Sequence, residues 1–164
     1  MNKKKNIFNK KTLKVYGVEI RDKDKTPLAK IKKNKKRRYP LDARVEVVVY
    51  TNHGNLRVVT QAGFEFDGRS GPSIIDWYVP NLGTLMEIVC WYVHDCNGYG
   101  KCLSFQDTNV LLFAMLRDMC CYRKTKAAVI QYAVGISDSW YGEPKPTEWC
   151  YKNRDLVSTV FEEL

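Results

Sequence analysis

Two helix-start patterns that stand close together constrain the fold of this chain more than any other feature. Thr84-Leu-Met-Glu87 and Ser104-Phe-Gln-Asp107 each place an acid three positions after a hydroxyl residue, which is the pattern of a capping box. Apolar residues follow each pattern at helical spacing, so we expect helices over about 84–95 and 104–120. Because only a short loop separates them, we expect the two helices to pack antiparallel.

The residues before this pair predict a small β layer. Two stretches rich in β-branched residues, 45–50 and 56–61, flank the turn cluster Asn-His-Gly-Asn and indicate a hairpin. Residues 15–20 are expected to form another short strand, and about 124–136 a third helix. The sequence therefore predicts an α+β fold, in which a small antiparallel β-hairpin layer is followed by an antiparallel helix pair and a third helix.

Charge divides the chain unevenly and suggests how it is organised. Residues 1–44 contain 17 Lys and Arg against 4 acids, whereas the rest contains 10 against 14, and the net charge is +9. We expect a basic N-terminal arm and connector over 1–44, a core domain over 45–141 and a C-terminal tail over 142–164. The tail has no interpretable pattern.

The densest basic cluster is the candidate site for an anionic partner, and it comprises Lys32, Lys33, Lys35, Lys36, Arg37 and Arg38. Such a run attracts phosphate or carboxylate groups over long distances, although a solvated surface is the alternative interpretation. Aromatic residues do not alternate with these charges apart from Tyr39, so base stacking is not indicated. An acidic protein or an anionic lipid is therefore favoured over nucleic acid.

The adjacent pair His94-Asp95 is the candidate for chemistry, because the chain has only two histidines. His94 falls near the end of the first expected helix and Asp107 in the first turn of the second, so both should lie at the same end of the helix pair. A hydrogen bond between them would hold the imidazole in one tautomer and leave its other nitrogen to accept a proton from water. His94 and Asp107 are therefore the predicted catalytic residues.

A calcium site is expected beside this histidine. Asp95 is turned by about 100° around the helix relative to His94 and would point toward the loop that contains Asp67. The carboxylates of Asp67 and Asp95, with carbonyl oxygens around Gly68, are hard ligands that suit calcium. The ion would polarise a substrate carbonyl and stabilise the oxyanion.

The same residues also have ordinary structural interpretations. A His-Asp dipeptide can be a hydrogen-bonded pair at a helix end, and Asp107 can be the capping acid of Ser104. Asp67 before a glycine is typical of a turn. The evidence for chemistry is the joint arrangement rather than any single residue.

The cysteine spacing and the hydropathy limit the other kinds of site and segment that the chain could contain. The chain has six cysteines and no C-x-x-C pair, so a structural zinc site is not indicated. Cys90 and His94 could share a helical face as metal ligands, but a small buried residue is the favoured interpretation of Cys90. The basic N-terminus lacks the apolar region of a secretory signal, so reduced thiols are expected. No apolar run reaches about 18 residues, so no transmembrane segment is expected.

Several motifs occur in an ordered set: Phe64-Glu-Phe-Asp67-Gly-Arg-Ser70-Gly-Pro72, then Val79-Pro80-Asn-Leu-Gly83, then His94-Asp95 and Asp107. This set resembles a family of phage and bacterial proteins known as domain of unknown function one-three-five-three, over about residues 45–141. The order of the His-Asp pair, the later aspartate and the antiparallel helices is also similar to small bacterial, secreted and parvoviral phospholipases A₂.

The second resemblance implies roles for individual residues. In those phospholipases a histidine is the general base, the next aspartate and an upstream Asp-Gly loop bind calcium, and a later helix supplies an orienting aspartate. The resemblance thus implies a general base at His94, calcium ligands at Asp95, Asp67 and Gly68, and the orienting role at Asp107. It also implies a helix pair of phospholipase A₂-like type.

Two functions stay open from the sequence. The first is a calcium-dependent ester hydrolase acting on phospholipid. The second is a non-catalytic phage virion structural or interaction protein, which uses the same fold and a basic arm to dock on phage structural proteins or anionic lipid. The expected location is the host cytoplasm or the virion.

Overall fold

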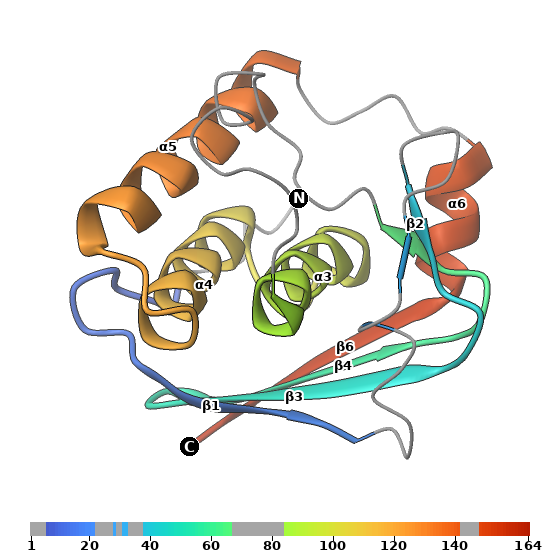
Figure 1. Ribbon diagram of the computed structural model, residues 1–164, viewed down its shortest axis with the longest axis horizontal. Coiled ribbons are helices and arrows are strands. Elements are labelled where there is room, and N and C mark those ends of the chain that lie inside the picture. Colours follow the sequence, from blue (N-terminus) through green and yellow to red (C-terminus); the bar gives the residue numbers. More distant parts are fainter. Residues whose placement is uncertain (1–5, 22–27, 29–30, 33–37, 67–83, 142–147) are drawn as a thin grey trace.

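The structure, a computed structural model, describes residues 6–21, 28, 31–32, 38–66, 84–141 and 148–164. Within these residues the fold is mixed α+β, with a four-stranded antiparallel sheet, a second sheet of two short strands and four helices, α3 to α6. Figure 1 shows α3 and α4 over one face of the larger sheet, with α5 beyond α4. The α+β class expected from the sequence is confirmed.

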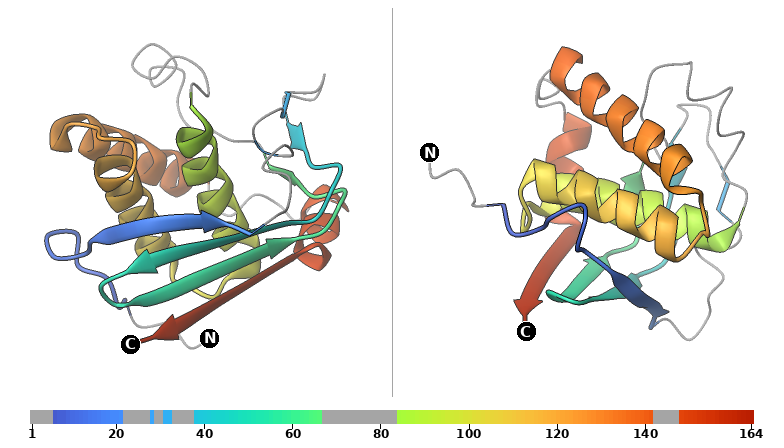
Figure 2. Two further views of the ribbon diagram at one scale, coloured as in Figure 1. Left: turned by 60° about the horizontal axis from the view of Figure 1, so that its bottom comes forward. Right: turned by 90° about the vertical axis from the view of Figure 1, so that its left-hand side faces the viewer.

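The larger sheet is built around a hairpin of β-branched residues. β3 (Val45–Thr51) and β4 (Gly54–Thr60) pair antiparallel. β1 (Val15–Ile20) pairs with the other side of β3, and β6 (Val157–Glu163) with the other side of β4. The strand order is β1-β3-β4-β6, which Figure 2 shows in its left-hand view. The hairpin and the strand over 15–20 agree with the prediction.

Both predicted helix starts are present, and at each of them a side chain caps the helix N-terminus. α3 (Leu85–Gly100) begins with a capping box, in which the Thr84 hydroxyl accepts from the Glu87 N–H and the Glu87 carboxylate accepts from the Thr84 N–H. α4 (Phe105–Asp118) begins after Ser104, whose hydroxyl accepts from the Asp107 N–H at 3.0 Å. The two helices pack against each other across the short connection 101–104, as predicted.

Three further elements complete the described structure. α5 (Lys124–Tyr141) packs against α4 and runs somewhat beyond the predicted 124–136. α6 (Glu148–Asp155) leads directly into β6. β2 (Tyr39–Pro40) and β5 (Glu65–Phe66) form the small second sheet, with Tyr39 opposite Phe66.

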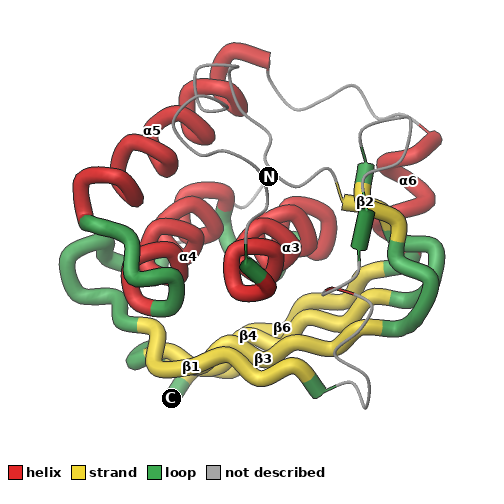
Figure 3. The backbone as a smooth tube through the Cα atoms, viewed as in Figure 1, coloured by secondary structure: helices red, strands yellow, loops and turns green. Residues whose placement is uncertain are grey.

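The hydrophobic core fills the space between the larger sheet and α3 and α4, whose layers are separated clearly in Figure 3. Because side chains alternate along a strand, every second residue of β3 and β4 points toward the helices. Val47, Val49, Leu56 and Val58 are fully buried on that side. α3 contributes Tyr92, whose hydroxyl lies 2.8 Å from the Thr60 hydroxyl in the same buried layer.

Segments on both sides of the expected 45–141 core contribute strands to the larger sheet, while the division into a 1–44 arm, a 45–141 core and a 142–164 tail stays a prediction. β1 comes from the expected arm and β6 from the expected tail, and these are the two outer strands of one sheet. Phe8, Leu13 and Leu28 are buried in the same core. Burial of these apolar side chains holds the described parts of the N-terminal segment on the domain.

Candidate functional site

His94 lies at the contact between α3 and α4, close to where the sequence placed it. Its Nδ1 is 3.3 Å from Asp95 Oδ1, and its Nε2 is 2.9 Å from Asn109 Oδ1 on α4. The side chain of His94 is 12% exposed and that of Asp95 is 7% exposed. Both ring nitrogens therefore face oxygen atoms in a nearly closed space. A general-base role would require one of these contacts to open first.

The predicted hydrogen bond between His94 and Asp107 is wrong. The partner of the imidazole is Asn109, which follows Asp107 by two positions. Residues two apart on a helix point about 200° away from each other, so only one of the two can face α3. The sequence predicted the correct end of the helix pair but not the residue that meets the histidine.

Asp107 instead joins the N-terminal segment to the start of α4. Its carboxylate accepts from the Phe8 N–H at 2.8 Å, from the Ile7 N–H at 3.1 Å and from the Ser104 hydroxyl at 2.8 Å. The residue is 1% exposed. A carboxylate in the first turn of a helix also interacts favourably with the helix dipole. The capping interpretation of Asp107 accounts for the contact with Ser104, and the bonds from Ile7 and Phe8 show that the same acid anchors a distant segment.

The predicted calcium ligands can be placed only in part. Asp95 is buried beside His94, whereas Asp67 and Gly68 lie outside the described residues. In the part of the chain that the structure describes, no three His, Cys, Asp or Glu side chains converge in a way that could hold a metal ion. The calcium site therefore stays a prediction.

The predicted anion-binding run is also only partly described. Lys32 is exposed, and Arg38 Nη1 lies 3.7 Å from Glu65 Oε2. The other four members, Lys33, Lys35, Lys36 and Arg37, lie outside the described residues. The role of this run in binding a partner stays a prediction.

A basic pocket that sequence reasoning missed lies where the segment before β1 meets the end of α4 and the start of α5. It has a volume of about 300 Å³, and we define it by its charged residues Lys11, Lys14, Arg117, Asp118 and Lys124. Figure 1 shows the three segments that form it together at the left of the molecule. Residues more than 100 positions apart meet here, so only the fold reveals the pocket.

The internal contacts of the basic pocket leave it positively charged. Arg117 Nη2 donates to Asp118 Oδ2 at 2.6 Å and to the Leu13 carbonyl at 2.7 Å, so the only acid of the pocket is paired with its arginine. Burial raises the pKa of Asp118, but hydrogen bonds from Arg117 and from the Val15 N–H outweigh it, and the pKa lies below its ordinary value. Asp118 is therefore ionised near neutral pH, and the lysines of the pocket provide its excess positive charge.

The start of α5 adds to this charge in an unusual way. Helix N-termini ordinarily carry acids in the first turn, because these offset the positive end of the helix dipole. The first turn of α5 has no acid and instead contains Lys124 and Lys126. Lys126 Nζ lies 4.3 Å from the centre of the Tyr122 ring, whereas Lys124 lines the pocket. An anion at this place would satisfy charges that the chain itself leaves unmatched.

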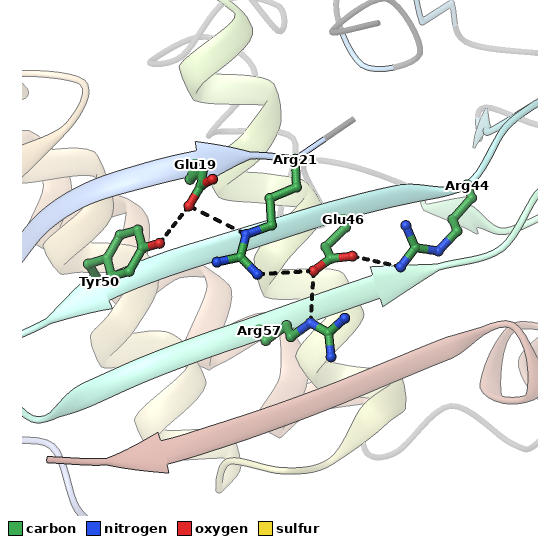
Figure 4. A network of polar contacts seen from close by, with 6 residues as sticks. All are labelled: Glu19, Arg21, Arg44, Glu46, Tyr50 and Arg57. Atoms are coloured by element: carbon green, nitrogen blue, oxygen red, sulfur yellow. Dashed lines mark hydrogen bonds and ion pairs between the residues drawn. The ribbon is translucent and has the colours of Figure 1, made fainter. Parts of the chain in front are cut away.

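The face of the sheet that points away from the helices carries a second polar cluster, which Figure 4 shows. Glu46 accepts from Arg44 Nη2 at 2.6 Å and from Arg57 Nε at 2.8 Å, and Arg21 Nη1 lies 3.5 Å from the same carboxylate. The hydrogen bonds from Arg57 and Arg44 lower the pKa of Glu46 to about 2. Beneath these side chains Val48 is only 4% exposed. Each of the three arginines in this cluster is paired with a carboxylate, so the cluster has the character of a stabilising surface.

Glu46→Gln should lower the free energy of unfolding at neutral pH by about 1–2 kcal/mol, because it removes the charged acceptor of Arg44 and Arg57 and leaves Arg21 with Glu19 alone. The value is modest because the three arginine side chains are 44–49% exposed and water screens them. The folded-state pKa of about 2 lies below the ordinary 4.5, so the carboxylate stabilises the fold above about pH 4.5 and ceases to do so as the pH falls to about 2. Urea titrations across this range should show wild type and variant converging at low pH.

Glu19→Gln is the matched control for this experiment. Glu19 lies in the same cluster and accepts from the Tyr50 hydroxyl, but it is exposed. Its replacement should change stability less than the replacement of Glu46 at neutral pH. A Glu46→Gln effect that is independent of pH would contradict the assigned pKa.

Comparison with known proteins gives no further guide to the site. No family model, curated protein or solved structure matches this chain. Among the described helices, none combines the length and the apolar character needed to span a bilayer.

Proposed function

We propose that this chain is a non-catalytic interaction protein that docks on an acidic partner through the basic pocket. The observation that carries the proposal is the grouping of Lys11, Lys14 and Lys124 around one small pocket whose only acid is already paired. A cluster of like charges at one place raises the association rate with an oppositely charged surface and selects against other partners.

The size of the pocket favours one class of partner. A volume of about 300 Å³ lies at the lower end of the range of small-ligand sites and can admit a carboxylate or phosphate group. Non-specific binding of single-stranded nucleic acid uses a groove that follows the backbone over several nucleotides, and a compact pocket does not provide one. We therefore favour an acidic protein surface, with an anionic lipid headgroup as the alternative. The motif resemblance to a phage family supports a partner among phage structural proteins, in the host cytoplasm or the virion.

A calcium-dependent phospholipid hydrolase is the second candidate. The observation in its favour is the position of His94 in the contact between α3 and α4, with a carboxylate oxygen of Asp95 3.3 Å away. A phospholipase A₂-like helix pair would also carry its histidine at the contact between two helices. The engagement of Asp107 by Ile7 and Phe8 weighs against it, because the predicted orienting carboxylate is used elsewhere.

Reversing the charge of the pocket should weaken binding to an acidic probe. For Lys11→Glu/Lys14→Glu, we expect the dissociation constant for a fluorescent polyglutamate peptide to rise about tenfold or more at low salt, with a smaller salt dependence. Fluorescence anisotropy measures both quantities. Lys152→Glu is the control, because Lys152 is an exposed lysine of α6 and does not line the pocket. Vesicles containing phosphatidylserine and a single-stranded oligonucleotide, titrated in parallel, identify the preferred source of negative charge.

Two outcomes would replace the proposal. If the pocket variant binds like wild type, while neutralising Lys32, Lys33, Lys35, Lys36, Arg37 and Arg38 removes binding, the docking site is the basic run. If wild type hydrolyses a short-chain phospholipid with calcium, and both a chelator and His94→Ala abolish turnover, the chain is an enzyme.

A further inference from the structure

Two cysteines from different segments meet between α3 and the connection that precedes α5. Cys90 lies in the middle of α3 and is fully buried, whereas Cys120 follows the C-cap of α4 and is partly exposed. Their sulfur atoms are 3.6 Å apart. Among the described cysteines, this is the pair whose thiols touch. Cys96 is buried, and Cys102 Sγ donates to Asn97 Oδ1 at 3.4 Å.

The surroundings give the two thiols different chemical characters. The contact with Cys90 lowers the pKa of Cys120, whereas the contact with Cys120 and burial raise the pKa of Cys90. The carboxylate of Glu87 faces both sulfurs and opposes thiolate formation, and it accepts from the Tyr122 hydroxyl at 2.7 Å. Cys120 is thus the thiol that ionises more readily and that a reagent in solution can reach.

We propose that Cys90 and Cys120 form a reversible disulfide when the protein meets a low-molecular-weight disulfide such as oxidised glutathione. The Cys120 thiolate attacks one sulfur of the reagent, giving a mixed disulfide and releasing one thiolate. Cys90 then loses its proton to solvent and attacks the Cys120 sulfur. This forms the protein disulfide and releases the second thiolate, so the two protein thiols are oxidised and one reagent disulfide is reduced.

The geometry allows this step with a small local movement. A disulfide needs a sulfur–sulfur distance of about 2.05 Å, whereas the thiols are 3.6 Å apart. Cys90 is held inside α3, whereas Cys120 follows the C-cap of α4, where its N–H still donates to the Met115 carbonyl at 3.3 Å and its side chain can rotate. Cys120 can therefore approach Cys90 without either helix being broken. The product would link α3 to the segment that leads into α5.

The test is a peptide map of the full chain after oxidation. Reduced protein is incubated in mixtures of oxidised and reduced glutathione, alkylated, digested and analysed by mass spectrometry. We expect the Cys90–Cys120 link to exceed any other link about tenfold, because the two thiols are already in contact. It should disappear after treatment with dithiothreitol.

Two variants assign the order of the steps. In Cys90→Ala the intermediate cannot resolve, so glutathione should accumulate on Cys120. In Cys120→Ala, Cys90 should stay unmodified because it is buried. Cys121→Ala is the matched control, since this neighbouring cysteine is exposed and its loss should leave the link intact. A dominant Cys120–Cys121 link, persistent glutathione on Cys120 in wild type, or no link at all in the wild-type map would each overturn the proposal, and none of these results depends on how a variant folds.

Discussion

Asp107→Ala should lower the free energy of unfolding by about 3 kcal/mol, which is a large fraction of the stability of an ordinary domain. The carboxylate is buried and accepts from the Ile7 and Phe8 N–H groups and the Ser104 hydroxyl. Removing it leaves these donors without their acceptor and deletes an acid from the first turn of α4. Urea denaturation should show a lower midpoint with an unchanged m-value.

The matched control is Gln106→Ala. Gln106 occupies the adjacent position in α4, but it is exposed and accepts only from the Asn6 side chain at 2.6 Å. Its replacement should change stability by less than about 0.5 kcal/mol. The same comparison separates the two interpretations of Asp107. A residue that served only to orient a catalytic histidine would affect turnover and leave stability nearly unchanged, so similar midpoints for both variants would refute the anchoring role.

Gly54→Ala should also lower the free energy of unfolding by about 3 kcal/mol, because of the backbone conformation and the close packing at this glycine. Gly54 opens β4 with a φ of 153°, a conformation that residues with a side chain rarely adopt. A Cβ atom there would lie 2.2 Å from the backbone oxygen of Glu162 and 2.9 Å from Phe161 Cζ. Since the first of these is backbone of β6, the alanine fits only if the pairing of β4 with β6 shifts.

Gly17→Ala is the natural comparison for this substitution. Gly17 lies in β1 of the same sheet, has an ordinary φ, and an added Cβ would meet nothing within 4 Å. We expect its replacement to change stability by no more than about 0.5 kcal/mol. Chemical denaturation measures both variants, and hydrogen exchange of the β6 amides should report the local opening caused by Gly54→Ala. Equal effects at the two glycines would show that the close approach to Glu162 is not what makes Gly54 necessary.

The sequence predicted what local interactions determine. Thr84 and Ser104 cap helices that begin where the pattern indicated, because a cap involves residues only three positions apart. The hairpin followed from its β-branched residues and turn cluster for the same reason. β6 was missed, because its alternation of polar and apolar residues becomes meaningful only when β4 offers a partner.

The candidate site was predicted less well, because it depends on contacts between distant segments. The sequence predicted that His94 would lie near the start of α4. Packing sets the rotation of α4 about its axis, and this rotation places Asn109 rather than Asp107 opposite the histidine. Nothing near Asp107 in the sequence indicates that it would accept from Ile7 and Phe8. The basic pocket likewise needs Lys14 and Lys124 to come together, and neither of the two described residues of the basic run, Lys32 and Arg38, lines it.

The placement of β6 has a consequence for how the domain is made. β4 and β6 are neighbours in the sheet, although helices α3 to α6 separate them in the chain. Pairings of such high contact order form slowly, because a long loop must close before they contribute any stability. During synthesis the ribosome delivers β4 well before β6, so the growing chain exposes the unpaired edge of β4 until β6 has emerged. The nascent chain is therefore vulnerable to aggregation during this interval, and the pairing of β6 with β4 completes the sheet.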